Sequence, residues 1–341
     1  MSKIFVTRKF PGTALDRLKE SGNGVTISEF DRPITQEELI DKGKGCDALL
    51  TLLTDKIDGE LVDAIGPQLK VVSNYAVGFD NINVPELSDR GIIAANTPCE
   101  EVNEAVAEHT WALLLALTRR IVEADESTRR GSYRGWEPNI FLGKSLKGKT
   151  LGVIGLGRIG TMVAKRAKGF EMRVLYNKRT PDTDAEKDIG IEFSDLDRLL
   201  RESDFVSLHV PLTDETRGMV NAESLGKLKQ GCYLINTARG PIVDEHALVD
   251  ALRSGHLSGA ALDVFEVEPN INPELIGMEN VVLTPHIASG THEAREKMGQ
   301  LAVDAVLQVL SGQVPENIIN KEVWPQARAN TEKELVRYKV A

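Results

Sequence analysis

The stretch TLGVIGLGRIGTMVAKRAKGFEMRVLYNKRT, Thr150–Thr180, holds three glycines between an apolar strand pattern and a helix pattern. Gly155, Gly157 and Gly160 have the spacing G-x-G-x-x-G, and between a strand and a helix this spacing indicates a dinucleotide site. The first glycine permits a tight turn, the second lets the backbone approach a pyrophosphate, and the third lets the helix lie close to the strand. We expect the diphosphate at the amides that open the helix near Arg158. The alternative is that the glycines only form a turn between strand and helix.

The second strand of this stretch ends without the carboxylate that is typical of NAD sites. An Asp or Glu about 20 residues into the motif bonds the ribose hydroxyls and disfavours a 2′-phosphate. Here that position is Asn177, and Lys178, Arg179 and Thr180 follow it. Two cations and a hydroxyl suit a phosphate group, so we predict NADP(H) in preference to NAD(H). The alternative is a solvated turn that accepts either cofactor, which leaves NAD(H) possible.

Short β-rich runs alternate with helical patterns on both sides of this stretch. KIFVT, VTISEF, ALLTLL, LKVVSN and GIIAAN precede residue 100, and TLGVIG, RVLYN, FVSLHV, CYLINT, GAALDVF and VVLTPH follow residue 149. The alternation predicts an α/β protein with two doubly wound parallel-sheet domains. Between the two sets of runs, apolar residues at helical spacing predict one long helix in CEEVNEAVAEHTWALLLALTRRIVEADESTRRG.

The pattern becomes helical again after TPHIASGT, and we expect this last helix to complete the first domain. The prediction is a Rossmann-type dinucleotide-binding domain, residues 100–285, inserted into a flavodoxin-like substrate domain, residues 1–99 and 286–321. Residues 322–341 are expected to be a C-terminal tail. A plain tandem of two domains is the alternative.

The composition argues against several classes of partner. Lys plus Arg number 41 against 51 Asp plus Glu, and the net charge of −10 disfavours nucleic acid or an anionic membrane. Cys46, Cys99 and Cys232 lie far apart, which predicts neither a disulfide framework nor a thiolate metal site and fits a reducing cytoplasm. MSKIFVTRKF reads as a strand, not a signal peptide, and WALLLALT is too short to span a bilayer. We expect a soluble, cytoplasmic protein without a metal.

Three different polar residues follow the last strands, where open α/β sheets bind ligands. They are Arg239 in INTARGPIVDE, Glu268 in GAALDVFEVEP and His286 in VVLTPHIASG. Hydride transfer to a carbonyl carbon needs a proton donor, which suits His286, and a cation that holds a carboxylate, which suits Arg239. Glu268 would favour the imidazolium. Each residue alone has a structural alternative, but three together favour a catalytic site, whereas His109 on the long helix is expected to be structural.

These motifs resemble those of the D-isomer-specific 2-hydroxyacid dehydrogenases over almost the whole chain. The matching segments are NYAVGFDNI (Asn74–Ile82), GLGRIG, LHVPLTDETRGMVN (Leu208–Asn221), NTARGPIVDE (Asn236–Glu245), ALDVFEVEP (Ala261–Pro269) and TPHIAS (Thr284–Ser289). The resemblance places the family's catalytic residues at Arg239, Glu268 and His286. It implies cofactor contacts at Leu156, Gly157, Arg158, Ile159, Asn177, Lys178, Arg179, Thr180, Val210, Pro211, Thr216, Thr237, Ala238, Arg239, Asp263, His286, Ile287 and Ala288. It also implies a substrate loop at Ala76, Val77 and Gly78, whose amides bind the substrate carboxylate together with Arg239 and His286.

Within the family, NYAVGFDNI, NKRT and GWEPNIFLG are most similar to glyoxylate and hydroxypyruvate reductases. The expected activity is therefore reduction of a small 2-oxo acid by NAD(P)H. Formate dehydrogenases of the family have an amide at the Glu268 position, so the carboxylate argues against that reaction. The alternatives are a dehydrogenase of another D-2-hydroxy acid and a dinucleotide-sensing protein similar to the family's corepressors. The resemblance also implies a homodimer formed through the inserted domain, where Trp136 either reaches the partner's active site or is an ordinary interface aromatic.

Overall fold

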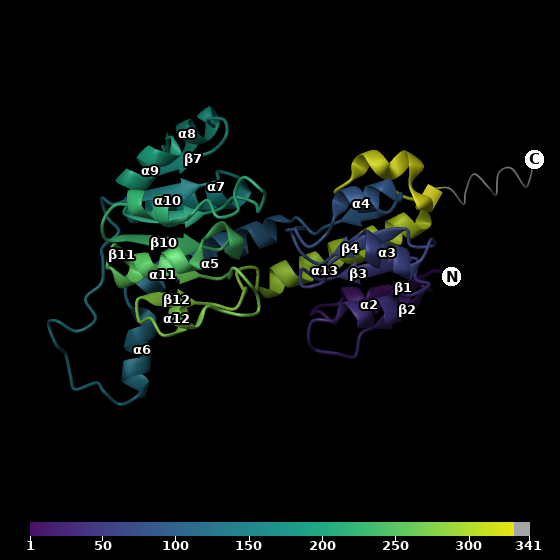
Figure 1. Cartoon of the computed structure of the whole chain (residues 1–341), viewed down its shortest axis with the longest axis horizontal. Coiled ribbons are helices and arrows are strands. Elements are labelled where there is room, and N and C mark those ends of the chain that lie inside the picture. The colour runs from purple at the N-terminus through teal and green to yellow at the C-terminus, as the bar shows by residue number, and fades with distance from the viewer. Residues whose placement is uncertain (331–341) are drawn as a thin grey trace, which may run out of the picture. The chain divides into compact units, whose positions relative to one another are not determined.

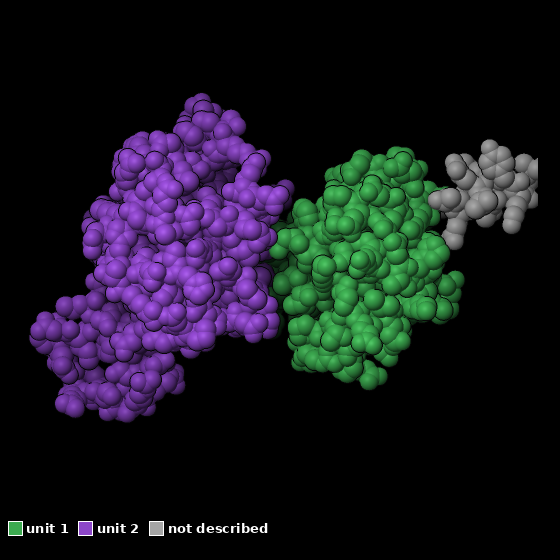
Figure 2. All heavy atoms as spheres, viewed as in Figure 1, with its two compact units in different colours: residues 1–102, 290–341 green, residues 103–289 purple. Residues whose placement is uncertain are grey.

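The computed structural model describes residues 1–330 of the chain, which forms two compact units (Figure 2). One unit consists of Met1–Val102 together with the chain from Gly290 onward, and the other of Asn103–Ser289. The second unit interrupts the first, so the two are not arranged in tandem. The predicted boundaries lie a few residues earlier, after residues 99 and 285. This difference corrects the assignment of His286, which belongs to the same unit as Arg239 and Glu268.

The first unit is built on a five-stranded parallel sheet in the order β2-β1-β3-β4-β5, the flavodoxin-like order (Figure 1). Its strands are β1 (Lys3–Val6), β2 (Gly24–Ile27), β3 (Ala48–Thr51), β4 (Val71–Asn74) and β5 (Ile93–Ala95). The helices that lie wholly within Met1–Val102 are α1 (Ala14–Glu20), α2 (Gln36–Gly43), α3 (Gly59–Ile65) and α4 (Val84–Asp89). Every residue of β3 and β4 is buried, as expected where helices cover both faces of a parallel sheet.

The last long helix, α13 (His292–Ser311), returns to this first unit and packs against α1, β3 and β4. Thr291 caps its first turn by accepting a hydrogen bond from the amide of Ala294. Residues 321–326 then form a 3-10 helix, η3 (Lys321–Gln326), in which Val323 is buried, and Ala327 beyond it is buried too. The predicted tail is therefore wrong for residues 322–330, which pack within the first unit. The rest of it lies outside the described residues.

The second unit is built on a seven-stranded parallel sheet in the order β12-β11-β10-β9-β6-β7-β8. Its first six strands have the Rossmann order, and β12 extends the sheet at one edge. The strands are β6 (Thr150–Ile154), β7 (Arg173–Asn177), β8 (Glu192–Phe193), β9 (Phe205–Leu208), β10 (Cys232–Asn236), β11 (Leu257–Leu262) and β12 (Val281–Leu283). The sequence prediction missed β8, because two residues leave no apolar run to detect.

Helices cover both faces of this second sheet (Figure 1). They are α7 (Arg158–Ala167), α8 (Thr183–Ile189), α9 (Leu196–Glu202), α10 (Ala222–Lys227), α11 (Glu245–Arg253) and α12 (Pro273–Ile276), together with α5 (Glu100–Thr118). On one face, α5 and α7 bury an apolar cluster with β6 and β7, and the indole N–H of Trp111 donates to the Val163 carbonyl at 3.1 Å. On the other face, α9 and α11 bury a second cluster.

The predicted long helix is broken in the structure. α5 ends at Thr118, Arg120 adopts a left-handed conformation with φ 52°, and a separate helix α6 (Ile121–Arg129) begins. In a continuous helix the Thr118 carbonyl would accept the amide four residues later, but here it accepts the amide of Lys144 at 2.9 Å. The prediction failed because a distant loop takes this carbonyl, which helical spacing does not reveal.

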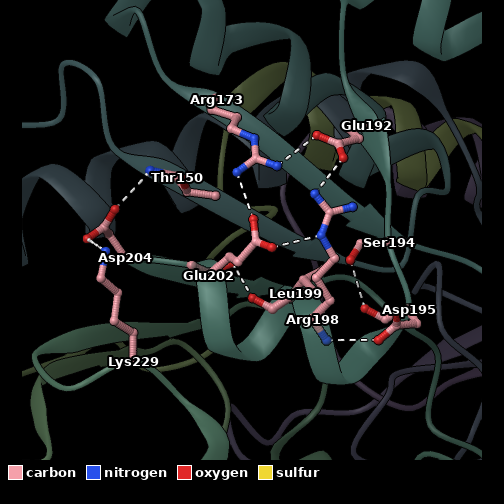
Figure 3. Close-up of polar contacts among 11 residues, drawn as sticks. Thr150, Arg173, Glu192, Ser194, Asp195, Arg198, Leu199, Glu202, Asp204 and Lys229 are labelled. Atoms are coloured by element: carbon pink, nitrogen blue, oxygen red, sulfur yellow. Dashed lines mark hydrogen bonds and ion pairs between the residues drawn. The ribbon is translucent and has the colours of Figure 1, made fainter.

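A closed ring of four charged residues ties the edge strand β8 to α9 (Figure 3). Arg173 on β7 contacts Glu192 on β8 and Glu202 on α9, each at 2.8 Å. Arg198 on α9 contacts the same two carboxylates, at 2.6 Å and 2.8 Å. Hydrogen bonds from the two guanidinium groups hold the pKa of each carboxyl below its usual value, so both stay ionised at neutral pH.

Candidate active site

The glycine turn has the geometry that its sequence predicts. Gly155 has φ +95°, and a Cβ on Gly160 would lie 2.1 Å from the Gly155 carbonyl oxygen, so α7 approaches the turn too closely for any other residue. A Cβ on Gly157 would meet open space. α7 begins at Arg158 without a side-chain cap from any described residue, although Asp or Thr side chains cap α9, α11 and α13. Its first amides therefore fit a diphosphate, as a dinucleotide requires.

The residues after β7 form a turn that is held by hydrogen bonds and that carries the two cations, Lys178 and Arg179. The Asn177 side-chain amide donates to the Ser194 carbonyl at 2.9 Å, and the Tyr176 hydroxyl accepts the amide of Asp182 at 2.7 Å. Lys178 pairs with Asp182 at 2.8 Å. Arg179 pairs with Glu215 at 3.2 Å, and both side chains are more than three-quarters exposed. Such an exposed ion pair is weak, so a phosphate can compete for Arg179.

The other residues of the predicted cofactor site follow β9, β10, β11 and β12. Val210 and Pro211 open the loop after β9, where the Thr216 hydroxyl donates to the Pro211 carbonyl at 2.7 Å. After β10, the hydroxyl of Thr237 lies 2.9 Å from that of Thr110 on α5. Because these strands are parallel neighbours, their ends lie along one edge of the sheet.

His286 and Glu268 form a hydrogen-bonded pair beyond β12 and β11. His286 Nδ1 lies 2.9 Å from Glu268 Oε2, and the other carboxylate oxygen accepts the amide of Phe265 at 3.2 Å. Burial would raise the pKa of Glu268, but the hydrogen bond and charge of His286 outweigh burial and lower it. Glu268 is therefore ionised at neutral pH and accepts a hydrogen bond from Nδ1–H of His286. The second ring nitrogen of His286, Nε2, is left for a substrate.

Arg239 stands at the end of β10, on a loop that approaches the loop carrying Glu268. The charge of Arg239 also helps to lower the pKa of Glu268, after the larger effects of burial and of His286. At Gly240 the two backbones meet, because a Cβ there would lie 1.7 Å from the Phe265 carbonyl oxygen. A side chain at residue 240 would push the two loops apart. The structure thus brings together the three residues that the sequence analysis selected.

Asp263 organises the turn that carries His286. Its backbone carbonyl accepts the amide of His286 at 2.8 Å, and its carboxylate accepts the amides of Ile287 at 2.9 Å and Ala288 at 2.8 Å. The Thr284 hydroxyl donates to the same carboxylate at 2.6 Å. His286 itself has φ +53°, a left-handed conformation that is unfavourable for a residue with a side chain and has to be held by its surroundings.

The loop Ala76–Gly78 lies in the first unit, directly after β4 and Tyr75. Its carbonyls are all bonded: that of Ala76 accepts the Thr97 amide at 2.9 Å, that of Val77 the Asn96 side chain at 2.7 Å, and that of Gly78 the Asn74 side chain at 3.1 Å. Within residues 1–330 the amides of Val77 and Gly78 have no hydrogen-bond acceptor. Two open amides on a loop fixed by its carbonyls can bind an anionic group.

The asparagines that shape these loops were not among the residues predicted from the sequence. Asn236 ends β10, and its side chain donates to the Arg239 carbonyl and accepts the Ala238 amide, both at 3.0 Å. Asn74 ends β4 and Asn96 follows β5, and both hold the loop Ala76–Gly78. The signal available in the sequence was a side-chain amide placed directly where an apolar strand stops.

Comparison with known proteins identifies the family. The model of the D-isomer specific 2-hydroxyacid dehydrogenase NAD binding domain matches residues 111–288, more than half of the chain. The chain belongs to the D-isomer specific 2-hydroxyacid dehydrogenase family. Residues matched by this model include the glycine turn and all three of Arg239, Glu268 and His286.

This dehydrogenase is similar to reductases along most of its length. A glyoxylate reductase of Thermofilum pendens is 51% identical over 324 residues, 94% of this chain and 95% of that relative. A glyoxylate reductase of Thermococcus litoralis is 47% identical over 325 residues, 94% of this chain and 97% of the relative. The structure of an NADPH-dependent glyoxylate/hydroxypyruvate reductase from Sinorhizobium meliloti in complex with citrate matches with a TM-score of 0.82 and 33% identity, covering 94% of this chain and 98% of that one.

Residues 1–330 of this dehydrogenase contain neither a metal-ligand cluster nor a membrane-spanning helix. In this part of the chain no three His, Cys, Asp or Glu side chains are grouped so that they could hold a metal ion. None of the helices described there is both long and apolar enough to cross a membrane.

Proposed function

We propose that this dehydrogenase reduces glyoxylate and hydroxypyruvate to the corresponding 2-hydroxy acids with NAD(P)H. The observation that carries the proposal is the hydrogen-bonded pair of His286 and Glu268, at the same sheet edge as Arg239 and the glycine turn. Two relatives that are 47% and 51% identical to this chain are glyoxylate reductases, which supports a small 2-oxo acid as the substrate. A protein that only senses dinucleotides has no need of an acid paired with a carboxylate.

In this proposal His286 is the proton donor. A bound nicotinamide supplies the hydride, and the imidazolium of His286 gives the proton from Nε2 to the substrate oxygen. Because Nδ1 is bonded to Glu268, the ring orientation is fixed and Nε2 is the nitrogen that can reach the substrate. Glu268 stabilises the imidazolium before transfer and keeps Nδ1 protonated after it.

The resemblance implies that Arg239 and the amides of Val77 and Gly78 bind the substrate carboxylate, and we adopt this as part of the proposal. The planar guanidinium matches a carboxylate with two parallel hydrogen bonds. The amides of Val77 and Gly78 have no acceptor among the described residues, which supports their use for an anion. Neutral hydroxyaldehydes lack a carboxylate and should therefore be poor substrates.

The assay that tests the function follows the loss of reduced-nicotinamide absorbance, with glyoxylate, hydroxypyruvate and pyruvate, each with NADPH and with NADH. We expect turnover with glyoxylate and hydroxypyruvate, and a higher kcat/KM with NADPH. Turnover confined to a bulkier 2-oxo acid would support a dehydrogenase of another D-2-hydroxy acid. Binding of NADPH without turnover of any of these acids would contradict the proposal and favour a dinucleotide sensor.

NADP(H) is the proposed cofactor because Asn177 stands where NAD sites usually have a carboxylate, and because Arg179 is held among residues 1–330 by an exposed ion pair with Glu215. A hydrogen bond to a charged group is worth about 1.5–3 kcal/mol, so Arg179→Ala should raise the KM for NADPH about 10- to 100-fold. The KM for NADH, which has no 2′-phosphate, should hardly change. Lys187→Ala, which removes an exposed cation from α8 nearby, is the matched control. An equal rise in both KM values for Arg179→Ala would contradict the proposed contact between Arg179 and the 2′-phosphate.

A homodimer formed through the inserted unit is also proposed. α6 and the loop after it project from the body of the second unit, and no residue of α6 is buried (Figure 1). Exposed apolar side chains gather on this helix and loop: Ile121, Val122, Tyr133, Trp136, Ile140 and Leu142. Of these, Val122 also lines a hollow of about 430 Å³, together with Phe141, Ile276 and Met278. An apolar surface of this kind marks an interface, and a second copy is the occupant that the resemblance implies.

Sedimentation equilibrium of the intact protein should therefore give twice the chain mass. Ile121→Glu should weaken the dimer, because it places a charge on the apolar face. Val314→Glu changes an equally exposed apolar residue of the first unit and should leave the dimer intact. A monomeric wild-type protein, or equal effects of the two changes, would contradict this interface. The place of Trp136 in a partner's active site stays a prediction.

A cytoplasmic location stays part of this proposal. Cys46, Cys99 and Cys232 are all free thiols in the structure, and two of them are buried. Free thiols are typical of a reducing compartment.

A further inference from the structure

His109 stands on α5, far in sequence from the catalytic residues, but its ring reaches the turn that carries His286. Nε2 of His109 lies 3.1 Å from the Thr284 hydroxyl oxygen and 3.4 Å from Asp263 Oδ1. The side chain of His109 is 19% exposed and that of Asp263 is fully buried. A helical histidine in an apolar pattern suggests ordinary core, yet this one meets the carboxylate that organises the turn.

The hydrogen bonds determine which atom of His109 carries a proton. The Thr284 hydroxyl has a single proton, and at 2.6 Å from Asp263 Oδ1 it is donated to that oxygen. Both oxygens of Asp263 also accept backbone amides, so this carboxyl has no proton of its own to give. The Thr284 oxygen can then only accept from His109, and Nε2 of His109 must be protonated.

The charge of Asp263 depends on this set of donors. Burial would raise the pKa of the Asp263 carboxyl, but the hydrogen bonds that it accepts, led by that from His109, outweigh burial and lower the pKa. The ionised carboxylate in turn holds the amides of Ile287 and Ala288 and so keeps His286 at φ +53°. The left-handed conformation of His286 is unfavourable by itself. We therefore expect His286 to leave it when the hydrogen bonds from Ile287 and Ala288 to Asp263 weaken.

We propose that His109 is a positioning residue for His286: its Nε2–H, donated to Thr284 and Asp263, fixes the carboxylate that holds the turn His286–Ala288. The role is indirect, because His109 contacts Thr284 and Asp263 and not the imidazole of His286. The proposal rests on the proposed function, in which His286 is the proton donor. The order of the turn can nevertheless be measured without any substrate or cofactor.

The test compares His109→Phe, which keeps a ring without a donor, with His109→Gln, whose side-chain amide can donate. Amide hydrogen exchange of the cofactor-free protein is the first readout. With His109→Phe, we expect exchange at Ile287 and Ala288 to rise at least about tenfold, as expected when a hydrogen bond to a charged group is lost. Exchange in β6, an interior strand of the sheet between β9 and β7, should not change. His109→Gln should restore most of the protection.

Reductase kinetics are the second readout. A small displacement of a catalytic group lowers turnover strongly, so kcat with glyoxylate should fall about 10- to 100-fold in His109→Phe and recover largely in His109→Gln. His256→Phe is the matched control, because His256 also bonds through Nε2, to the Leu225 carbonyl at 3.0 Å. This control should change neither kcat nor exchange at the turn.

Thr284→Val provides a second route if His109→Phe folds poorly, since it removes the hydroxyl that His109 contacts. It should produce the same local rise in exchange at Ile287 and Ala288. Unchanged exchange at this turn in both variants would overturn the proposal. So would a rise of equal size throughout the second unit, which would show a purely structural role. Absence of reductase activity in the wild-type protein would instead refute the proposed function and leave the exchange result valid.

Discussion

Replacing His286 by alanine should lower kcat for glyoxylate reduction by about 10²–10⁴-fold, the range that general acid catalysis contributes. The affinity for NADPH should stay nearly unchanged, because alanine keeps the backbone atoms that Asp263 binds. Stopped-flow or steady-state measurement of NADPH oxidation gives the rate, and fluorescence titration of the free protein gives the affinity. An unchanged rate would exclude His286 as the proton donor.

His286→Asn is the control for the backbone at this position. The left-handed conformation with φ +53° is tolerated better by asparagine than by most other residues, so the turn should be preserved while the proton donor is lost. The two variants should therefore have similar kcat values. Glu268→Gln should lose less activity than either, since an amide still orients Nδ1 but no longer favours the imidazolium. If the alanine variant is slow and the asparagine variant is not, backbone strain and not proton transfer explains the loss.

Arg239→Leu should lower kcat/KM for glyoxylate by about 10²–10³-fold. In the proposed function it removes two charge-assisted hydrogen bonds to the substrate carboxylate, which together contribute roughly 3–4 kcal/mol. The loss should be specific for the carboxylate. Glycolaldehyde, which has the carbonyl but no carboxylate, should react slowly with the wild-type protein and equally slowly with the variant. The measurement is therefore kcat/KM for both substrates with both proteins.

Arg239→Lys is the matched charge-conserving variant, and it should recover part of the activity, since a lysine keeps the charge but not the planar fork. If Arg239→Leu lowers kcat/KM for glycolaldehyde as much as for glyoxylate, the residue acts on the loop and not on the substrate. Gly240 makes this distinction necessary, because the adjoining backbones of the Arg239 and Glu268 loops meet there.

Much of the fold was predictable because its signals are local. The glycine turn lies between its strand and helix as expected, and parallel strands place their ends at one edge, so three loops distant in sequence converge. For this reason the sequence pattern alone assigns Arg239, Glu268 and His286 to one site. The same pattern carries no geometry for the first unit's loop at Ala76–Gly78, which depends on asparagines of β4 and of the chain after β5.

The errors arose where a distant residue decides a local conformation. Helical spacing continues past Thr118, yet the amide of Lys144 takes the carbonyl that the next turn needs and the helix breaks. The expectation that His109 is structural is not tested, but its contacts with Thr284 and Asp263 are equally invisible in the helix pattern. Such contacts join residues far apart in the chain, and no pattern of neighbouring residues records them.

The ring of charges around β8 also bears on how the protein behaves at high concentration. The outer strand of an open sheet offers unpaired amides and carbonyls to other chains, and very short strands with charged side chains are a common protection against this. β8 has two residues, and one of them, Glu192, is held by two arginines. An incoming strand would have to desolvate these charges before pairing with β8. This edge is therefore a poor template for intermolecular sheet growth.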